Sequence, residues 1–134
     1  MKIKKVNHIG IAVNDIDEAA KLYTEILGLK VTNVEVVSDQ NAKTAIIPVG
    51  DTKIELIQST SPEGTIAKFI ENKGEGLHHI ALEVDDIKDA LQTVGDKGVR
   101  LIDENPRKGV ENTDIAFLHP KGTKILLEFV EPGE

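Results

Sequence analysis

The sequence predicts an α+β fold made of two tandem modules, each with the order strand, helix and three strands. The main observation is an internal repeat, in which a shift of 71 residues (79 − 8) places residues 8–20 on residues 79–91 with six identities. About one identity would arise by chance in such a window, so the two segments are predicted to be copies of one unit. A second likeness joins GDTKIELI, residues 50–57, to GTKILLEFV, residues 122–130, if the later copy carries two extra residues.

The first module opens with a predicted strand near residues 3–13, where apolar residues alternate with polar or small ones. A helix is expected in NDIDEAAKLYTEILG, because Asp15 is a suitable N-cap, Glu18 fits a capping box and Gly28 is a natural stop. Three further strands are expected near residues 30–37, 43–49 and 52–58, with the turn between the last two at residues 50–51.

The second module repeats this order. A strand is expected at 78–84, a helix from about 86 to 97 that ends before Gly98, and strands near 100–102, 112–118 and 123–130. A short helix is expected in the linker between the modules, which is rich in Ser, Pro and Gly at its ends. The chain is therefore predicted to be a single domain over residues 1–134, with module one near 1–60, the linker near 61–75 and module two near 76–134.

Strand alternation predicts which side chains share a face of the sheet. In each module the apolar residues of the first strand should face the helix that follows, which turns His8 and His79 to the other face. The same alternation turns Glu55 and Glu128 to that face in later strands, whereas His78 should point the opposite way from His79. The residues predicted to face the helices are Ile9, Ile11, Val13, Ile54, Leu56, Ile80, Leu82, Val84, Ile125, Leu127 and Phe129.

Composition and charge exclude several classes of function. The formal net charge of -7 argues against nucleic-acid binding, which needs a basic face, and the few aromatic residues argue against base stacking. Cys is absent, so disulfides and thiolate metal sites are excluded. No apolar run approaches a bilayer span and no secretion signal is evident at the amino end, so we expect a cytoplasmic protein without a membrane partner.

With His8, Glu55, His79 and Glu128 on one face, the chain resembles the vicinal oxygen chelate superfamily over nearly its whole length. The resemblance implies that the two modules form a curved mixed sheet, a half-barrel around a metal site, with the helices on the outer face. It also implies that these four residues bind a divalent ion. Two imidazoles and two carboxylates suit Co, Ni, Zn or Mn better than calcium, although the sequence does not identify the metal. Dimers are common in the superfamily, so a homodimer is expected.

The segments GLHHIA, HPK and TIAKFIE make the chain most similar to the methylmalonyl-CoA epimerase family. This resemblance implies interconversion of (R)- and (S)-methylmalonyl-CoA by removal of the proton alpha to the thioester, with the metal stabilising an enediolate and Glu128 moving the proton. One alternative is glyoxalase I (lactoylglutathione lyase), which would act on the methylglyoxal–glutathione hemithioacetal with the same ligands. A further alternative is a non-catalytic protein of the same fold that binds a small molecule.

The chain departs from that family at one catalytic position. Some members carry a second glutamate base in the strand before PVG, and the alignment of DQNAKTAIIPVG places Thr44 there. The second acid/base group is therefore open, with a bound water or another group, helped by Lys43, as candidates. Thr44 and Lys121 are candidate substrate contacts, and the candidate contacts to the phosphates of an acyl-CoA are Lys121, Lys124, Arg107 and Lys108.

Overall fold

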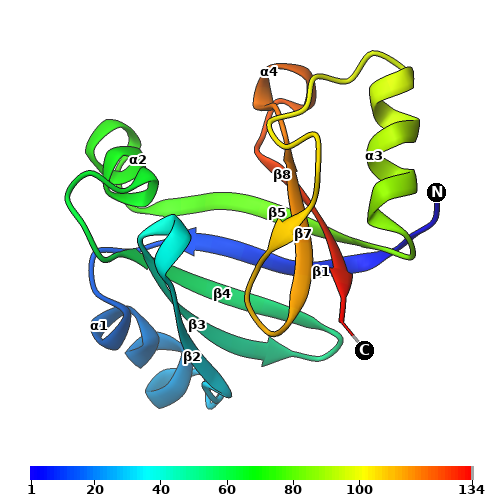
Figure 1. The fold of residues 1–134 in the computed structure, drawn as a ribbon. Coiled ribbons are helices and arrows are strands. Elements are labelled where there is room, and N and C mark those ends of the chain that lie inside the picture. Colours follow the sequence, from blue (N-terminus) through cyan, green and yellow to red (C-terminus); the bar gives the residue numbers. More distant parts are fainter. Residues whose placement is uncertain (134) are drawn as a thin grey trace. The chain divides into compact units, whose positions relative to one another are not determined.

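The computed structural model describes residues 1–133, which divide into two compact units. We call His8–His78 the first unit, and Met1–Asn7 together with the described residues from His79 onward the second unit. The eight strands of the described residues follow the order β2-β3-β4-β1-β5-β8-β7-β6. Strand β1 (Ile3–Ala12) contributes residues to both units. The predicted α+β class, with one strand–helix–three-strand set in each half of the chain, is confirmed (Figure 1).

Three strands join the end of β1 in the first unit. Strand β3 (Ala42–Val49) runs antiparallel to both β2 (Asn33–Val37) and β4 (Thr52–Ser59), and β4 runs parallel to β1. The predicted turn at residues 50–51 is present, with Gly50 at φ 59°, a left-handed conformation that glycine adopts without strain. Strand β2 begins later than predicted because the N–H of Leu29 still closes the preceding helix on the carbonyl of Tyr23 at 2.8 Å.

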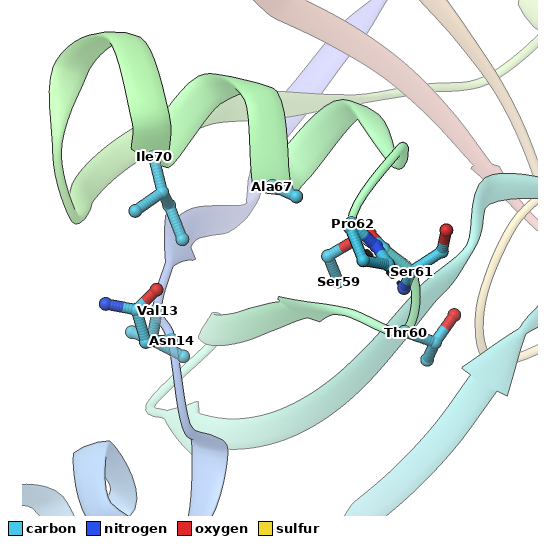
Figure 2. A pocket seen from close by; sticks show the side chains of 8 residues that line it. All are labelled: Val13, Asn14, Ser59, Thr60, Ser61, Pro62, Ala67 and Ile70. Atoms are coloured by element: carbon cyan, nitrogen blue, oxygen red, sulfur yellow. Dashed lines mark hydrogen bonds between the residues drawn. The ribbon is translucent and has the colours of Figure 1, made fainter.

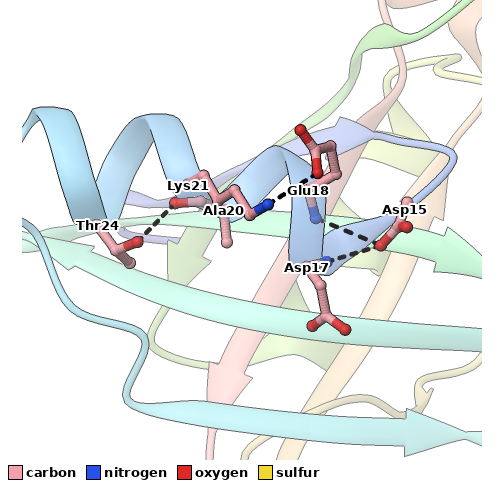
Figure 3. A network of polar contacts seen from close by, with 6 residues as sticks. All are labelled: Asp15, Asp17, Glu18, Ala20, Lys21 and Thr24. Atoms are coloured by element: carbon pink, nitrogen blue, oxygen red, sulfur yellow. Dashed lines mark hydrogen bonds and ion pairs between the residues drawn. The ribbon is translucent and has the colours of Figure 1, made fainter.

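Helix α1 (Ile16–Lys21) begins where the sequence predicts, since Oδ1 of the N-cap Asp15 accepts the N–H groups of Asp17 and Glu18 (Figure 3). The Glu18 carboxylate pairs with Lys21 at 3.1 Å and does not close the predicted capping box. Instead of one continuous α-helix, the chain changes to a π-helical segment, η1 (Leu22–Ile26).

The π-helical segment has a local cause in the chain. The hydroxyl of Thr24 donates to the carbonyl of Ala20 at 3.1 Å, and this is the carbonyl that the N–H of Thr24 would use in an α-helix. The segment ends at Gly28, whose φ of 72° confirms the predicted stop.

The two helices of the first unit that pack on its sheet lie on opposite faces. Helix α1 packs on one face, which we call the helix face, through Ile16 against Val13, Ala45 and Leu56. Helix α2 (Thr65–Lys73), the predicted linker helix, packs on the other face. That contact joins Ile66, Phe69 and Ile70 of the helix to Ala12, Ala42 and Ile57 of the strands.

The second unit has the same plan. Strand β8 (Leu127–Pro132) runs parallel to β5 (Gly76–Val84) and antiparallel to β7 (Thr113–Leu118), which also pairs with the short edge strand β6 (Arg107–Lys108). Helix α3 (Ile87–Asp96) begins at the N-cap Asp86, which accepts the N–H of Asp89 at 3.1 Å. Its buried residues Ile87 and Leu91 pack on the helix face with Phe129. No helix among the described residues is long and apolar enough to cross a bilayer.

Three predictions about the second module were wrong in detail. The strand expected near 100–102 is reduced to one bridge between Leu101 and Leu118. The strand expected over 123–130 begins only at Leu127, because helix α4 (Pro120–Thr123) and the left-handed Lys124 occupy the preceding residues. Ile125, which we expected in the core, is therefore 39% exposed.

The strand registers confirm the internal repeat. Gly10 lies opposite Glu55 in the first unit, and Ala81 lies opposite Glu128 in the second. The first members of these pairs differ by 71 positions (81 − 10) and the second by 73 (128 − 55), which is the shift with two extra residues that the sequence predicts. Each unit therefore brings its glutamate to the equivalent place beside its histidine strand.

Candidate metal centre

The first unit places His8 and Glu55 side by side on the face opposite the helix face, which we call the polar face. Parallel pairing of β1 with β4 sets Gly10 against Glu55, and Ile11 and Leu56 point to the helix face. His8 is 6% exposed and Glu55 is 5% exposed. The imidazole Nε2 of His8 lies 3.8 Å from Oε1 of Glu55.

The second unit holds a matching pair on its own polar face. His79 and Glu128 are each 3% exposed, and Nε2 of His79 lies 3.4 Å from Oε1 of Glu128. The ring of Phe117 meets the ring of His79 edge-on, with the centroids 5.7 Å apart and an interplanar angle of 89°. Phe117 lies directly opposite Glu128 in the β7–β8 register, so one aromatic side chain supports this pair on the sheet.

The chemistry of each pair fits a divalent ion. A nitrogen–oxygen distance of 3.8 Å or 3.4 Å is longer than a typical hydrogen bond of about 2.9 Å. Neighbouring ligands of one ion, each bound at about 2.1 Å, lie about 3 Å apart, so a small closure of either pair would allow both atoms to bind the same cation. Carboxylates this deeply buried are costly unless positive charge accompanies them, which a cation would supply. The predicted positions on the polar faces are confirmed, and the ligand roles stay predictions.

Thr44 is also on the polar face of the first unit. It lies opposite Ile57 in the β3–β4 register and opposite Glu35 in the β2–β3 register, and it is 2% exposed. Its hydroxyl donates to the main-chain carbonyl of Glu35 at 3.3 Å. At the position where some family members have a glutamate, this chain therefore has a small side chain that bonds to the neighbouring strand.

The other two histidines of the chain lie outside these pairs. His78 meets the ring of Phe69 in α2 edge-on at 4.9 Å. His119 is the N-cap of α4, and its Nδ1 accepts the N–H of Lys121 at 3.1 Å. The Lys121 side chain is exposed, so it is accessible to an anionic ligand. Both histidines thus take part in local structure, His78 against α2 and His119 at the start of α4.

Two further charged residues of the second unit lie on its polar face. Glu83 follows His79 by four positions on the same strand and is 8% exposed, with Asn7 Nδ2 at 2.9 Å from its Oε1 and Lys4 Nζ at 3.7 Å from its Oε2. Strand alternation predicts this placement, because residues 79, 81 and 83 share one face. Asn7 and Lys4 stabilise the buried Glu83 carboxylate, so its burial has a structural explanation.

Arg107 is the second of these residues. Its guanidinium carbon lies 5.4 Å from the centre of the Phe117 ring, and its Nε lies 3.3 Å from Oδ1 of Asp103. Arg107 pairs with Ile115 across β6 and β7, so it shares the polar face of the second unit. The sequence indicated Arg107 as a candidate phosphate contact but not its place on the sheet, because no strand was predicted at residues 107–108.

A surface pocket in the first unit lies between α2 and the ends of β1 and β4. Val13, Asn14, Ser59, Thr60 and Ile70 are among its lining residues (Figure 2). Among the described residues, the lining includes no histidine, lysine, arginine or carboxylate. It therefore offers a small, mostly neutral surface and none of the groups that acid/base chemistry needs.

Comparison with known proteins identifies a family and several similar proteins. A model of the Glyoxalase/Bleomycin resistance protein/Dioxygenase superfamily matches residues 7–117. An ethylmalonyl-CoA/methylmalonyl-CoA epimerase from Cereibacter sphaeroides is 36% identical over 121 residues, which are 89% of this chain and 90% of the relative. The crystal structure of methylmalonyl-CoA epimerase from Mycobacterium tuberculosis is similar with a TM-score of 0.95 and 33% identity, covering 98% of this chain and 90% of that one. A variant of the Streptomyces coelicolor methylmalonyl-CoA epimerase, solved with 2-nitronate-propionyl-CoA, is similar with a TM-score of 0.94 and 31% identity, covering 99% and 100%.

Proposed function

Because the chain belongs to the Glyoxalase/Bleomycin resistance protein/Dioxygenase superfamily, we propose that it is a metal-dependent epimerase that interconverts (R)- and (S)-methylmalonyl-CoA. Its homologues include methylmalonyl-CoA epimerases, which are isomerases. The observation that carries the proposal is the pair of buried histidine and glutamate residues that each unit holds at repeat-related positions. Each unit thus contributes one histidine and one glutamate to the proposed ligand set.

The proposed metal ligands are His8, Glu55, His79 and Glu128. Two neutral imidazoles and two carboxylates balance the charge of a divalent ion, and this donor set suits Co, Ni, Zn or Mn. When bound, the ion would supply positive charge that stabilises the negative charge developing on the thioester oxygen. The buried positions of all four residues favour this role, because a dry environment strengthens such an interaction.

Glu128 is the proposed catalytic residue. Its carboxylate would accept the proton from the carbon between the carboxylate and the thioester, while the electron pair of the broken C–H bond moves toward the carbonyl oxygen. The Nε2 atom of His79 lies 3.4 Å from Oε1 of Glu128, so the two proposed ligands are neighbours on the polar face. Inversion requires that the new proton arrive on the opposite face of the carbon, so a second acid/base group is needed.

Binding of the coenzyme would depend on local positive charge in an acidic chain with a net charge of -7. Lys121 is exposed on α4 and is the proposed phosphate contact, and Thr44 on the polar face is a proposed contact to the acyl group. Replacement of Lys121 by alanine should raise KM for methylmalonyl-CoA more than it lowers kcat. A fall in kcat alone would contradict this assignment.

The proposed function is tested with two substrates in parallel. Metal-loaded protein is given methylmalonyl-CoA in D₂O, and exchange of the alpha proton is followed by NMR. The same preparation is given the methylglyoxal–glutathione hemithioacetal, and lactoylglutathione is measured. Deuterium entry without lactoylglutathione supports the epimerase, and the reverse result favours glyoxalase I. Tight binding of methylmalonyl-CoA without either reaction would favour a non-catalytic binding protein.

A homodimer and a cytoplasmic location are proposed as well. The edge strand β2 exposes Val34 by 54% and Val36 by 60%, and apolar side chains on a sheet edge favour contact with a second copy. Sedimentation of wild-type protein and of the Val36→Lys variant tests this contact. A wild-type monomer at micromolar concentration would contradict the homodimer.

A further inference from the structure

We propose that Glu35 is the second acid/base residue. In some family members a glutamate at the position of Thr44 has this role. The inference rests on the proposed epimerase function. Its starting point is the β2–β3 register, in which Glu35 and Thr44 are direct cross-strand neighbours. A carboxylate lost from one strand would thus be replaced by a carboxylate on the next strand.

Register places Glu35 on the polar face of the first unit. Directly opposite residues of antiparallel strands project to the same face, and Glu35, Thr44 and Ile57 form one such row across β2, β3 and β4. The neighbouring row contains Glu55, together with Ile46 and Asn33. The carboxylates of Glu35 and the proposed ligand Glu55 therefore emerge on the same side of the sheet.

Burial agrees with this placement. Val34 and Val36, which alternate with Glu35, point to the other face and are 54% and 60% exposed, whereas Glu35 is only partly exposed. Thr44 beside it is 2% exposed and has a short side chain. A glutamate at position 35 can consequently extend across Thr44 toward the space above β4.

Two hydrogen bonds fix the position of Glu35. The side-chain amide of Asn33 donates to Oε1 of Glu35 at 3.2 Å, which two residues on the same face of a strand can do. The hydroxyl of Thr44 donates to the main-chain oxygen of Glu35 at 3.3 Å and ties β2 to β3. Asn33 is thus a positioning residue, and Thr44 stabilises the strand that carries the carboxylate.

The separation suits a small acyl group. Strands β2 and β4 are two strand spacings apart, which is about 10 Å. An acyl group held near Glu55 on β4 would therefore lie on the polar face between that strand and Glu35.

The residue of the second unit that is equivalent to Glu35 is Arg107. Thr44, the cross-strand neighbour of Glu35, corresponds to Ile115 (44 + 71), and Arg107 pairs with Ile115. A guanidinium cannot accept a proton, so only the first unit has an acid/base group at this position.

The proposed step balances without an oxidant or a co-reactant. One carboxylate accepts the alpha proton as the C–H bond breaks, and the electron pair moves into the enolate. The other group, present as a carboxylic acid, donates its proton to the opposite face of the same carbon and forms the new C–H bond. In this assignment Glu35 is one of these two groups, and the two groups exchange protonation states in each turnover.

The test is isotopic and uses each methylmalonyl-CoA epimer separately in D₂O. In the Glu35→Gln variant, epimerisation should fall by at least about 100-fold, the usual contribution of a general acid/base group. One epimer should still exchange its alpha proton for deuterium with retention of configuration, because the other acid/base group still removes that proton. Asp39→Asn is the matched control, since Asp39 is an exposed carboxylate just beyond β2, and this variant should behave as wild type.

A second variant tests the replacement directly. Adding Thr44→Glu to Glu35→Gln puts a carboxylate back on the same face one strand away, so epimerisation should recover at least tenfold over Glu35→Gln alone. Bound metal is measured in every variant to verify that the fold and the ligands are intact, and if the double variant does not fold, the isotopic result of Glu35→Gln decides.

The two proposals fail in different ways. Unchanged epimerisation in Glu35→Gln, or equal loss of exchange from both epimers with metal retained, would overturn the role of Glu35. An absence of exchange in the wild-type protein would instead overturn the proposed function.

Discussion

The two units share a backbone plan and differ in charge at their sheet edges. In the first unit the edge strand β2 has five residues and presents Glu35 opposite Thr44, whereas in the second unit β6 has two residues and presents Arg107 opposite Ile115. The histidine and glutamate pairs, by contrast, are the same in both. The two units have therefore kept the same histidine and glutamate pair and have diverged in the charged residue at the sheet edge.

The starts of the two main helices show the same relationship. The N–H of Ile16 donates to Oε1 of Gln58, and the N–H of Ile87 donates to Oε1 of Glu131, both at 2.8 Å. These positions are repeat-related, since 16 + 71 is 87 and 58 + 73 is 131. One helix start is thus held by a neutral amide and the other by a carboxylate.

The largest expected effect tests whether the two pairs are equivalent. His8→Ala and His79→Ala should each weaken metal binding by more than about 100-fold, because even a residue that only supports a ligand contributes 10- to 100-fold. Metal content after dialysis, measured by elemental analysis, checks the prediction. His78→Ala is the control and should retain the ion. Normal binding in either single variant would show that one pair suffices and would break the proposed equivalence.

The next effect concerns the helix starts. Glu131→Ala should lower the free energy of unfolding by about 2 kcal/mol and Gln58→Ala by about 1 kcal/mol, because a charged acceptor also interacts with the positive end of the helix dipole. Urea denaturation measures both. Glu131→Gln should keep the hydrogen bond and lose only the interaction of the negative charge with the helix dipole, about 1 kcal/mol. A smaller loss for Glu131→Ala than for Gln58→Ala would contradict this ranking.

A smaller effect is expected at the edge of the second unit. Arg107→Gln should raise KM for methylmalonyl-CoA about tenfold, as expected for loss of one charge-assisted hydrogen bond to an anion. The change should leave kcat nearly unaltered. Lys88→Gln is the control, because Lys88 is an exposed lysine of α3, the helix that packs on the helix face. Equal KM values for the two variants would show that Arg107 has no special role.

The smallest expected effect is a pH-dependent contribution to stability from Asp85. The repeat-related residue of the first unit, Asn14, is neutral and cannot make this contribution. The N–H of Lys2 donates to Asp85 at 3.1 Å and holds the pKa of that carboxyl below its ordinary value of 3.8. A lowered pKa stabilises the fold above pH 3.8, and this contribution disappears as the pH falls through the lower value in the folded state. Asp85→Asn should therefore reduce stability slightly at pH 7 and leave it unchanged in strong acid. An NMR titration midpoint for Asp85 above 3.8 would contradict the sign.

Sequence patterns predicted the residues whose placement depends on local alternation. His8, Glu55, His79 and Glu128 lie on strands with clear apolar periodicity, so their faces followed from the repeat. The π-helical segment was missed because it depends on the Thr24 hydroxyl and its acceptor, which a helical pattern does not reveal.

The positions of Glu35 and Arg107 on the polar faces were not predicted, for a different reason. Each depends on which residue lies across the neighbouring strand, Thr44 in one case and Ile115 in the other. Register of this kind is decided by pairing over many residues of chain and has no local signature.

Strand β1 also has a consequence for the second half of the chain. Its first residues belong to the second unit, and its later residues belong to the first. A fragment that began at residue 76 would lack the strand next to β5, and its open edge would favour pairing with another chain. The amino-terminal residues of the chain therefore close a sheet edge that the second half of the sequence alone would leave open.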